Sequence, residues 1–183
     1  DFPLASHTID SCQVIHIGTG RPGYYRKIMK AASKLGKPIY FDPAQELHYI
    51  YTPEIFRELL DMSHAFFCNQ SELATAMKYL ELTDKKELLE FVDLLVITLG
   101  KDGSQILTKT EEINIPAIEP EQVLDPTGAG DAYRAGFYAG LCRQKGLDEC
   151  GWLGAAAASF AIEVNGPVGY LPTWEEVLER SGI

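Results

Sequence analysis

Strand-like and helix-like segments alternate along the chain, and this alternation constrains the fold more than any other feature. Short apolar runs lie at residues 13–17, 38–41, 65–68 and 94–99, with helix-like stretches between them. The run at 94–99 is apolar almost throughout, as strands covered on both faces are. Strands that alternate with helices form βαβ units and a mainly parallel sheet. The sequence therefore predicts a three-layer α/β/α fold, in one domain over residues 1–183.

Local signals set the expected element boundaries. Gly36 follows a helical stretch at 24–35 as a helix-ending glycine does, and Thr52 with Pro53 has the pattern of an N-cap and first turn. We expect further helices at 71–80, from 83 onward, at 129–145, at 147–164 and at 174–179, and a hairpin from 103–108 and 112–115. Ligands of open α/β sheets bind beyond the carboxyl ends of the strands, so we expect the site in those loops.

The composition excludes several classes of partner. The 26 acidic and 16 basic residues give a net charge of −10 without a basic cluster, so a nucleic-acid binder is not expected. No apolar run reaches the length of a membrane span. The cysteines form no C-x-x-C pair and the histidines show no ligand spacing, which favours free thiols in a reducing cytosol and no zinc site. We expect a cytoplasmic protein with a small-molecule ligand.

Residues 125–131 (DPTGAGD) carry the most chemistry. Gly128 and Gly130 have no side chains, so a ligand can approach the backbone closely at this helix start. The first-turn N–H groups and the helix dipole favour an anion there. Such a loop can hold a phosphoryl group. Asp131 in the first turn can take the proton from an attacking hydroxyl group. From composition alone, a helix start with an acidic first turn and no ligand is the alternative.

The segment DPTGAGDAYRAGFYAG resembles the C-terminal signature of the ribokinase-like (PfkB) carbohydrate kinases. Two further segments agree, in the family's order. NQSE at 69–72 resembles its N-x-x-E motif, and TLGKDG at 98–103 resembles its T-x-G-x-x-G nucleotide loop. The tail at 165–173 resembles the loop that closes over adenine. The resemblance spans nearly the whole chain and implies a kinase that moves the γ-phosphate of ATP to a hydroxyl of a sugar or nucleoside.

The resemblance implies catalytic roles at the helix start. Asp131 would be the base, and Gly128, Ala129 and Gly130 would form an anion hole through their N–H groups.

It also implies residues for the metal ions and the nucleotide. Asn69 and Glu72 would position Mg²⁺ through water molecules, and Asp125 would help to bind the monovalent cation, such as K⁺, that many members use. The residues that would contact ATP are Thr98, Gly100, Gly103 and Asn165. The alternatives are a plain helix N-terminus at 69–72 and a plain strand-to-strand turn at 98–103.

The chain departs from the family pattern in three places. Asp42-Pro43-Ala44-Gln45 stands where many members have Asp-Pro-Asn, and is similar to nucleoside-kinase members. Arg134 stands where a small or apolar residue is more usual. Nothing corresponds to the family's N-terminal glycine pair, its sugar contacts or its β-sheet lid, so we expect a fold that lacks those parts. Ribose, fructose, a phosphorylated sugar and a nucleoside all stay open as acceptor, as does a homodimer.

A second glycine pattern supports a rival function. Gly18, Gly20 and Gly23 satisfy G-x-G-x-x-G after a strand and before a helix, with Asp42 about 20 residues on. These are the criteria of a dinucleotide site, so a NAD-dependent oxidoreductase is one alternative. Pro22 is unusual in that turn, and this function leaves the downstream motifs unexplained. The other alternative is a non-catalytic nucleotide-binding relative, against which the presence of Asp131 argues.

Overall fold

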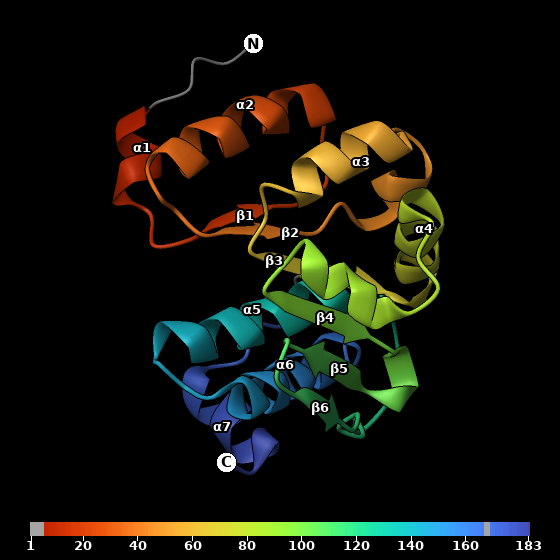
Figure 1. Cartoon of the computed structure of the whole chain (residues 1–183). Helices are drawn as coiled ribbons and strands as arrows, with labels where there is room; N and C mark the ends of the chain where they lie inside the picture. The colour runs from red at the N-terminus through yellow and green to blue at the C-terminus, as the bar shows by residue number, and fades with distance from the viewer. Residues whose placement is uncertain (1–5, 167–168) are drawn as a thin grey trace. The chain divides into compact units, whose positions relative to one another are not determined.

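A computed structural model describes residues 6–166 and 169–183 of the chain (Figure 1). The strands are hydrogen-bonded in the order β1 (Ile15–Ile17), β2 (Ile39–Phe41), β3 (Ala65–Asn69), β4 (Leu94–Thr98), β5 (Ser104–Leu107) and β6 (Glu112–Ile115). The α-helices are α1 (Ser6–Ser11), α2 (Pro22–Lys34), α3 (Pro53–Leu60), α4 (Gln70–Leu80), α5 (Ala129–Cys142), α6 (Leu147–Ala161) and α7 (Trp174–Ser181). The 3₁₀-helices are η1 (Ala44–His48), η2 (Lys85–Glu90) and η3 (Gly100–Asp102).

The first three strands run parallel, as the strand–helix alternation predicts. Ile15 pairs with Ile39 in β1 and β2, and Tyr40 pairs with Ala65 in β2 and β3. The expected mainly parallel sheet with helices is therefore confirmed. No helix among residues 6–166 and 169–183 has the length and apolar character needed to cross a bilayer.

The chain divides into two compact units. The N-terminal unit contains residues 1–97 with 107–111, and the C-terminal unit contains residues 98–106 with 112–183. The expectation of a single domain over 1–183 stays a prediction.

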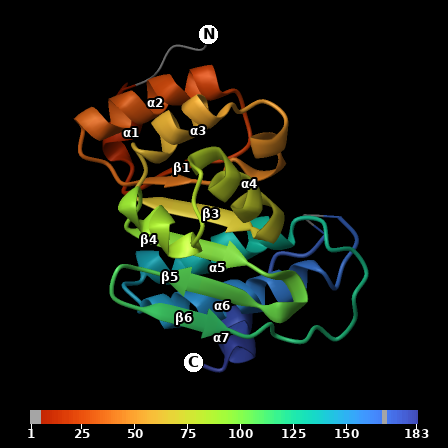
Figure 2. The ribbon, with the colours of Figure 1, turned by 45° about the vertical axis from the view of Figure 1, so that its right-hand side comes forward.

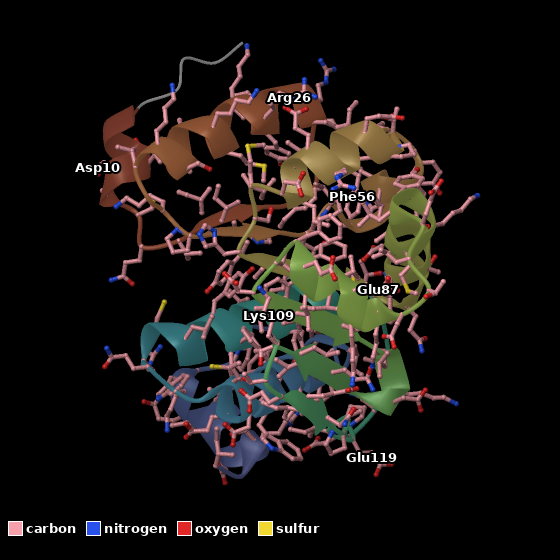
Figure 3. The ribbon with its side chains drawn as sticks, viewed as in Figure 1. Asp10, Arg26, Phe56, Glu87, Lys109 and Glu119 are labelled. Carbon is pink, nitrogen blue, oxygen red and sulfur yellow. The ribbon has the colours of Figure 1, made fainter. Side chains whose placement is uncertain are left out.

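An aromatic cluster forms the core of the N-terminal unit. Phe41, Phe56 and Phe66 are fully buried, and their ring centroids lie 5.6 to 6.2 Å apart. In Figures 1 and 2, α2 and α3 lie on the same side of β1 and β2. Figure 3 shows Phe56 below α3, among the side chains of this interior. Arg26 of α2 and Glu58 of α3 form a half-exposed ion pair of 2.7 Å between the two helices.

Small residues let α5 and α6 pack closely in the C-terminal unit. A Cβ on Gly136 of α5 would lie 2.3 Å from the carbonyl oxygen of Leu153 in α6, so only glycine fits there. A Cβ on Gly151 of α6 would lie 2.6 Å from Ile115 of β6, and Figure 2 shows α5 and α6 behind β5 and β6. The hydroxyl groups of Tyr133 in α5 and Ser104 in β5 hydrogen-bond at 2.8 Å, and both side chains are buried. Residues 125–131 therefore precede and open a helix that is tied to β5.

Several element boundaries differ from the prediction. The helix expected to reach residue 164 ends at Ala161, because the carbonyl oxygen of Ile162 accepts the N–H of Leu124 at 2.8 Å. The helix expected to reach 145 ends at Cys142, since Gln144 has a left-handed φ of 60°. The helix expected from 83 is the 3₁₀-helix η2, and neither α1 nor η1 was expected.

Candidate active site

The loop before α5 presents backbone N–H groups at its tip. Gly128 is the N-cap of α5 with φ 86°, a left-handed conformation that favours glycine. Among the described residues, no hydrogen bond engages the N–H groups of Gly128 and Gly130, whereas the N–H of Ala129 donates to the carbonyl oxygen of Pro126 at 3.2 Å. First-turn amides lack intrahelical partners, so this pair is available to an anion. The prediction included Ala129, whose N–H closes the turn instead.

Asp125 holds this loop in shape. Its Oδ1 accepts the N–H of Thr127 at 2.9 Å, and its Oδ2 accepts the N–H of Gly166 at 3.0 Å. Hydrogen bonds from Thr127, by its side chain and its N–H, and from the Gly166 N–H lower the pKa of the Asp125 carboxyl. The residue therefore stays ionised and ties the loop to the segment after α6. A role in binding a monovalent cation stays a prediction.

Asp131 lies in the first turn of α5 with its carboxylate towards solvent. Its side chain is 76% exposed, and its Oδ1 accepts a hydrogen bond from Nη2 of Arg134, whose side chain is 18% exposed. Sequence reasoning noted both residues but missed this contact, which their i, i+3 spacing on a helix could have indicated. The carboxylate is thus exposed and held by Arg134, and its role as the base stays a prediction.

Asp131 also borders a groove within the C-terminal unit. The groove has a volume of about 400 Å³ and is lined by α5 residues that include Ala132, Ala135 and Ala139, and by Tyr170 and Trp174 before and in α7. The small side chains of α5 leave this space open. No sequence pattern indicated the groove, because the groove depends on how three helices pack together.

The predicted nucleotide loop turns tightly between β4 and β5. The N–H of Leu99 donates to the carbonyl oxygen of Gly103 at 2.8 Å, and Gly100 has φ 60°. A Cβ on Gly103 would lie 2.0 Å from the carbonyl oxygen of Ile115, so this glycine is required by the backbone of β6. Thr98 ends β4. The local structure explains the glycines, and contact of this loop with ATP stays a prediction.

Asn165 precedes Gly166 in the predicted adenine segment. Its side chain is exposed, and its neighbour Gly166 donates to Asp125. The hydrogen bond to Asp125 therefore places this segment beside the loop that opens α5. Pro167 and Val168 of the segment lie outside the described residues.

Asn69 and Glu72 form the N-terminus of α4 in the N-terminal unit. Asn69 Oδ1 accepts the N–H of Glu72 at 2.9 Å, and Glu72 Oε2 accepts the N–H of Asn69 at 2.8 Å, which is a capping box. Glu72 is 6% exposed. Burial, followed by the charges of Glu72 and Asp42, raises the pKa of the Cys68 thiol. Two carboxylates therefore lie near the ends of β2 and β3, and the sequence already placed Asp42 directly after its strand.

In the rival glycine loop of the N-terminal unit, side chains of the protein itself occupy the space and the N–H group at Gly20. The N–H of Gly20 donates to the Glu46 carboxylate, and a Cβ on Gly20 would lie 2.4 Å from the Tyr25 hydroxyl oxygen. Glu46 is in η1, which the sequence did not predict. A carboxylate at this amide repels a pyrophosphate, so the geometry opposes a dinucleotide site between Gly18 and Gly23.

Comparison with known proteins identifies the family. The model of the pfkB family carbohydrate kinases matches residues 6–174. A nucleoside kinase of Methanocaldococcus jannaschii is 40% identical over 168 residues, which cover 92% of this chain and 55% of that protein. A nucleoside kinase of Methanothermobacter thermautotrophicus is 35% identical over 181 residues, which cover 98% of this chain and 57% of that protein.

Solved structures agree with this assignment. The crystal structure of the M. jannaschii nucleoside kinase, an archaeal member of the ribokinase family, has a TM-score of 0.88 at 37% identity and covers 97% of this chain and 61% of that one. A Burkholderia thailandensis nucleoside kinase in complex with inosine also has a TM-score of 0.88, at 25% identity, with 94% and 57% covered. The chain thus spans little more than half the length of these relatives. It belongs to the pfkB family of carbohydrate kinases and has the ribokinase-like fold.

Proposed function

We propose that the protein is an ATP-dependent phosphotransferase that moves the γ-phosphate of ATP to a hydroxyl group of a nucleoside or sugar. The start of α5 carries the proposal, because the N–H groups of Gly128 and Gly130 lie there beside the exposed carboxylate of Asp131. Fixed N–H donors stabilise the charge of a phosphoryl group in transfer, and a carboxylate can take the proton of the acceptor. The family match supports the same chemistry.

The proposed reaction is a direct transfer. The acceptor hydroxyl oxygen forms a bond to the γ-phosphorus while the bond from that phosphorus to the bridging oxygen of ADP breaks. Asp131 takes the hydroxyl proton, and ADP leaves with the electron pair of the broken bond. Gly128 and Gly130 donate to the oxygens of the transferred group. We assign the ATP contacts to Thr98, Gly100, Gly103 and Asn165 of the C-terminal unit.

The proposed Mg²⁺ residues fit an indirect contact. The capping box engages Asn69 Oδ1 and Glu72 Oε2, so a direct bond to those atoms would break the helix cap, whereas contact through water would not. When bound, Mg²⁺ would neutralise phosphate charge. For K⁺, the Asp125 carboxylate would have to bind the ion in addition to three existing hydrogen bonds, which its roughly four lone-pair sites allow.

A nucleoside is the acceptor that we favour over a sugar. The relatives at 40% and 35% identity are both nucleoside kinases, and the B. thailandensis neighbour was solved with inosine. The residues Asp42 to Gln45, which resemble nucleoside-kinase members, agree with this choice. A cytoplasmic location and a homodimer remain predictions.

Asp131→Asn tests the proposal in the full chain. We expect phosphoryl transfer, followed as ADP release with a panel of nucleosides and sugars, to fall by about 10²–10⁴-fold, since a base contributes that much, while ATP binding stays near the wild-type value. Asp148→Asn, a change in the first turn of α6, is the matched control and should keep full activity. An Asp131→Asn protein that keeps most of its turnover would remove Asp131 from the role of base.

Nucleotide binding separates the kinase from the two alternatives. We expect calorimetry to detect binding of ATP. NADH fluorescence should show no binding, because the N–H of Gly20 already donates to the Glu46 carboxylate. Binding of NADH in place of ATP would favour the oxidoreductase. Binding of ATP without turnover of any acceptor would favour a non-catalytic relative.

A further inference from the structure

The helix that carries Asp131 also carries an arginine in contact with it. Nη2 of Arg134 donates to Oδ1 of Asp131 across one turn of α5. The arginine side chain is 18% exposed and the aspartate side chain is 76% exposed. Packing therefore restrains the guanidinium, and the guanidinium in turn restrains a carboxylate that would otherwise turn freely in solvent.

The guanidinium lies close to the proposed anion hole as well. A Cβ on Gly130 would lie 3.8 Å from Nη1 of Arg134, so this end of the guanidinium lies close to the first turn at Gly130. The proton acceptor, the Gly130 backbone and the arginine thus gather at one helix start. The arginine consequently sets the side of that start on which the Asp131 carboxylate lies.

Helix stability alone does not favour an arginine at this position. Cations are favoured at helix C-termini, because the dipole makes the N-terminus positive. Asp131 is already favourable in the first turn without a partner, and a pair with one solvent-exposed member adds little to stability. The pair is therefore better explained by what it does to the carboxylate.

The other basic side chains of the C-terminal unit have different surroundings. Arg143 lies over the ring of Trp174 at 3.9 Å, Lys145 pairs with Glu149 at 2.7 Å, and Arg180 pairs with Glu163 at 2.7 Å. Lys101 is in η3 of the predicted nucleotide loop. Among the basic residues that the structure describes in this unit, Arg134 is the one that pairs with the proposed base, Asp131.

We propose that Arg134 is a positioning residue that holds the Asp131 carboxylate in the orientation needed to take the acceptor proton. This inference rests on the proposed function of Asp131. A guanidinium is suited to the task because its planar fork fixes the geometry of a carboxylate, whereas an ammonium group binds as a point charge. The arginine acts through Asp131 and forms no bond to the reacting atoms.

A kinetic double-mutant cycle in the full chain tests this role. Arg134→Gln should lower kcat by about 10- to 100-fold, the usual consequence of a small misplacement, with the KM values for ATP and acceptor little changed. Arg134→Lys should restore part of the loss. In an Asp131→Asn background, Arg134→Gln should lower kcat by no more than about twofold, because the group that it positions is already inactive. Lys145→Gln, which breaks an ion pair after α5, is the control and should leave the rate unchanged.

The outcomes distinguish this inference from the proposed function. Arg134→Gln with wild-type kcat, or an equal loss of kcat in both backgrounds, would overturn the positioning role and leave the kinase proposal intact. A rise in kcat would also overturn it, because the pair would then restrain the base unproductively. Asp131→Asn with full activity would overturn both. If the unfolding curves of Arg134→Gln match those of the Lys145→Gln control, its loss of kcat does not come from loss of the folded structure.

Discussion

The crossing of α5 and α6 gives a sharp test of the C-terminal unit, because Gly136 has no room for a methyl group. In Gly136→Ala the new Cβ would lie 2.3 Å from the carbonyl oxygen of Leu153 and 2.9 Å from the Cβ of Ala157. Non-bonded carbon contacts are favourable from about 3.5 Å, so the helices must separate by about 1 Å. Such overpacking costs about 1–3 kcal/mol or more, and the carbonyl is helix backbone that cannot rotate away. We therefore take the upper end of that range, about 3 kcal/mol. Alanine returns up to about 1 kcal/mol of helix propensity, which leaves an expected net loss of about 2 kcal/mol.

Tryptophan fluorescence measures this loss in the right part of the molecule. Trp152 in α6 and Trp174 in α7 are the two tryptophans of the chain, and both lie in the C-terminal unit, so denaturant unfolding reports on it. Gly130→Ala on the same helix is the matched control. A Cβ there meets Arg134 Nη1 at 3.8 Å, an ordinary contact, and stability should stay equal or rise by up to about 1 kcal/mol. A Gly136→Ala protein as stable as wild type would refute the close packing of α5 on α6.

Two further predictions concern a buried phenol and the proposed metal residue. Burial raises the pKa of Tyr133 from 10.0 to about 12. Between pH 10 and about pH 12 the phenol is therefore deprotonated in the unfolded chain but protonated in the folded chain. The free energy of unfolding should fall by up to about 2.7 kcal/mol as the pH rises through this range. Tyr133→Phe should remove this part of the alkaline loss in fluorescence-detected unfolding, and an unchanged pH dependence would show that the phenol does not titrate as described. Glu72→Gln should raise the Mg²⁺ concentration needed for half-maximal ADP release, while Glu54→Gln, in the first turn of α3, should not. An identical Mg²⁺ titration for Glu72→Gln and wild type would argue that Glu72 only caps α4.

Local interactions could be predicted from the sequence because their partners lie within a few residues of each other. Thr52 caps α3 by accepting the N–H of Ile55, and Gly36 adopts φ 64° after α2, as the sequence indicated. The reciprocal bonds of Asn69 and Glu72 likewise span three residues. The alternation of strands and helices, and the glycine loop that opens α5, were visible for the same reason. The family resemblance depends on these local motifs, and the comparisons confirmed it.

The tertiary structure decided the features whose partners are far apart in the chain. The carbonyl oxygen of Ile162 accepts the N–H of Leu124, and α6 ends before it. The Glu46 carboxylate accepts the N–H of Gly20, so that amide of the rival glycine loop is not available to a ligand. No local pattern specifies either bond, because each depends on where the folded chain returns. The same holds for the hydroxyl pair that ties Tyr133 to Ser104. The sequence by itself thus determined most of the elements, the motifs and the family. Packing between distant segments decided where α6 stops and which glycine loop keeps its amides available to a ligand.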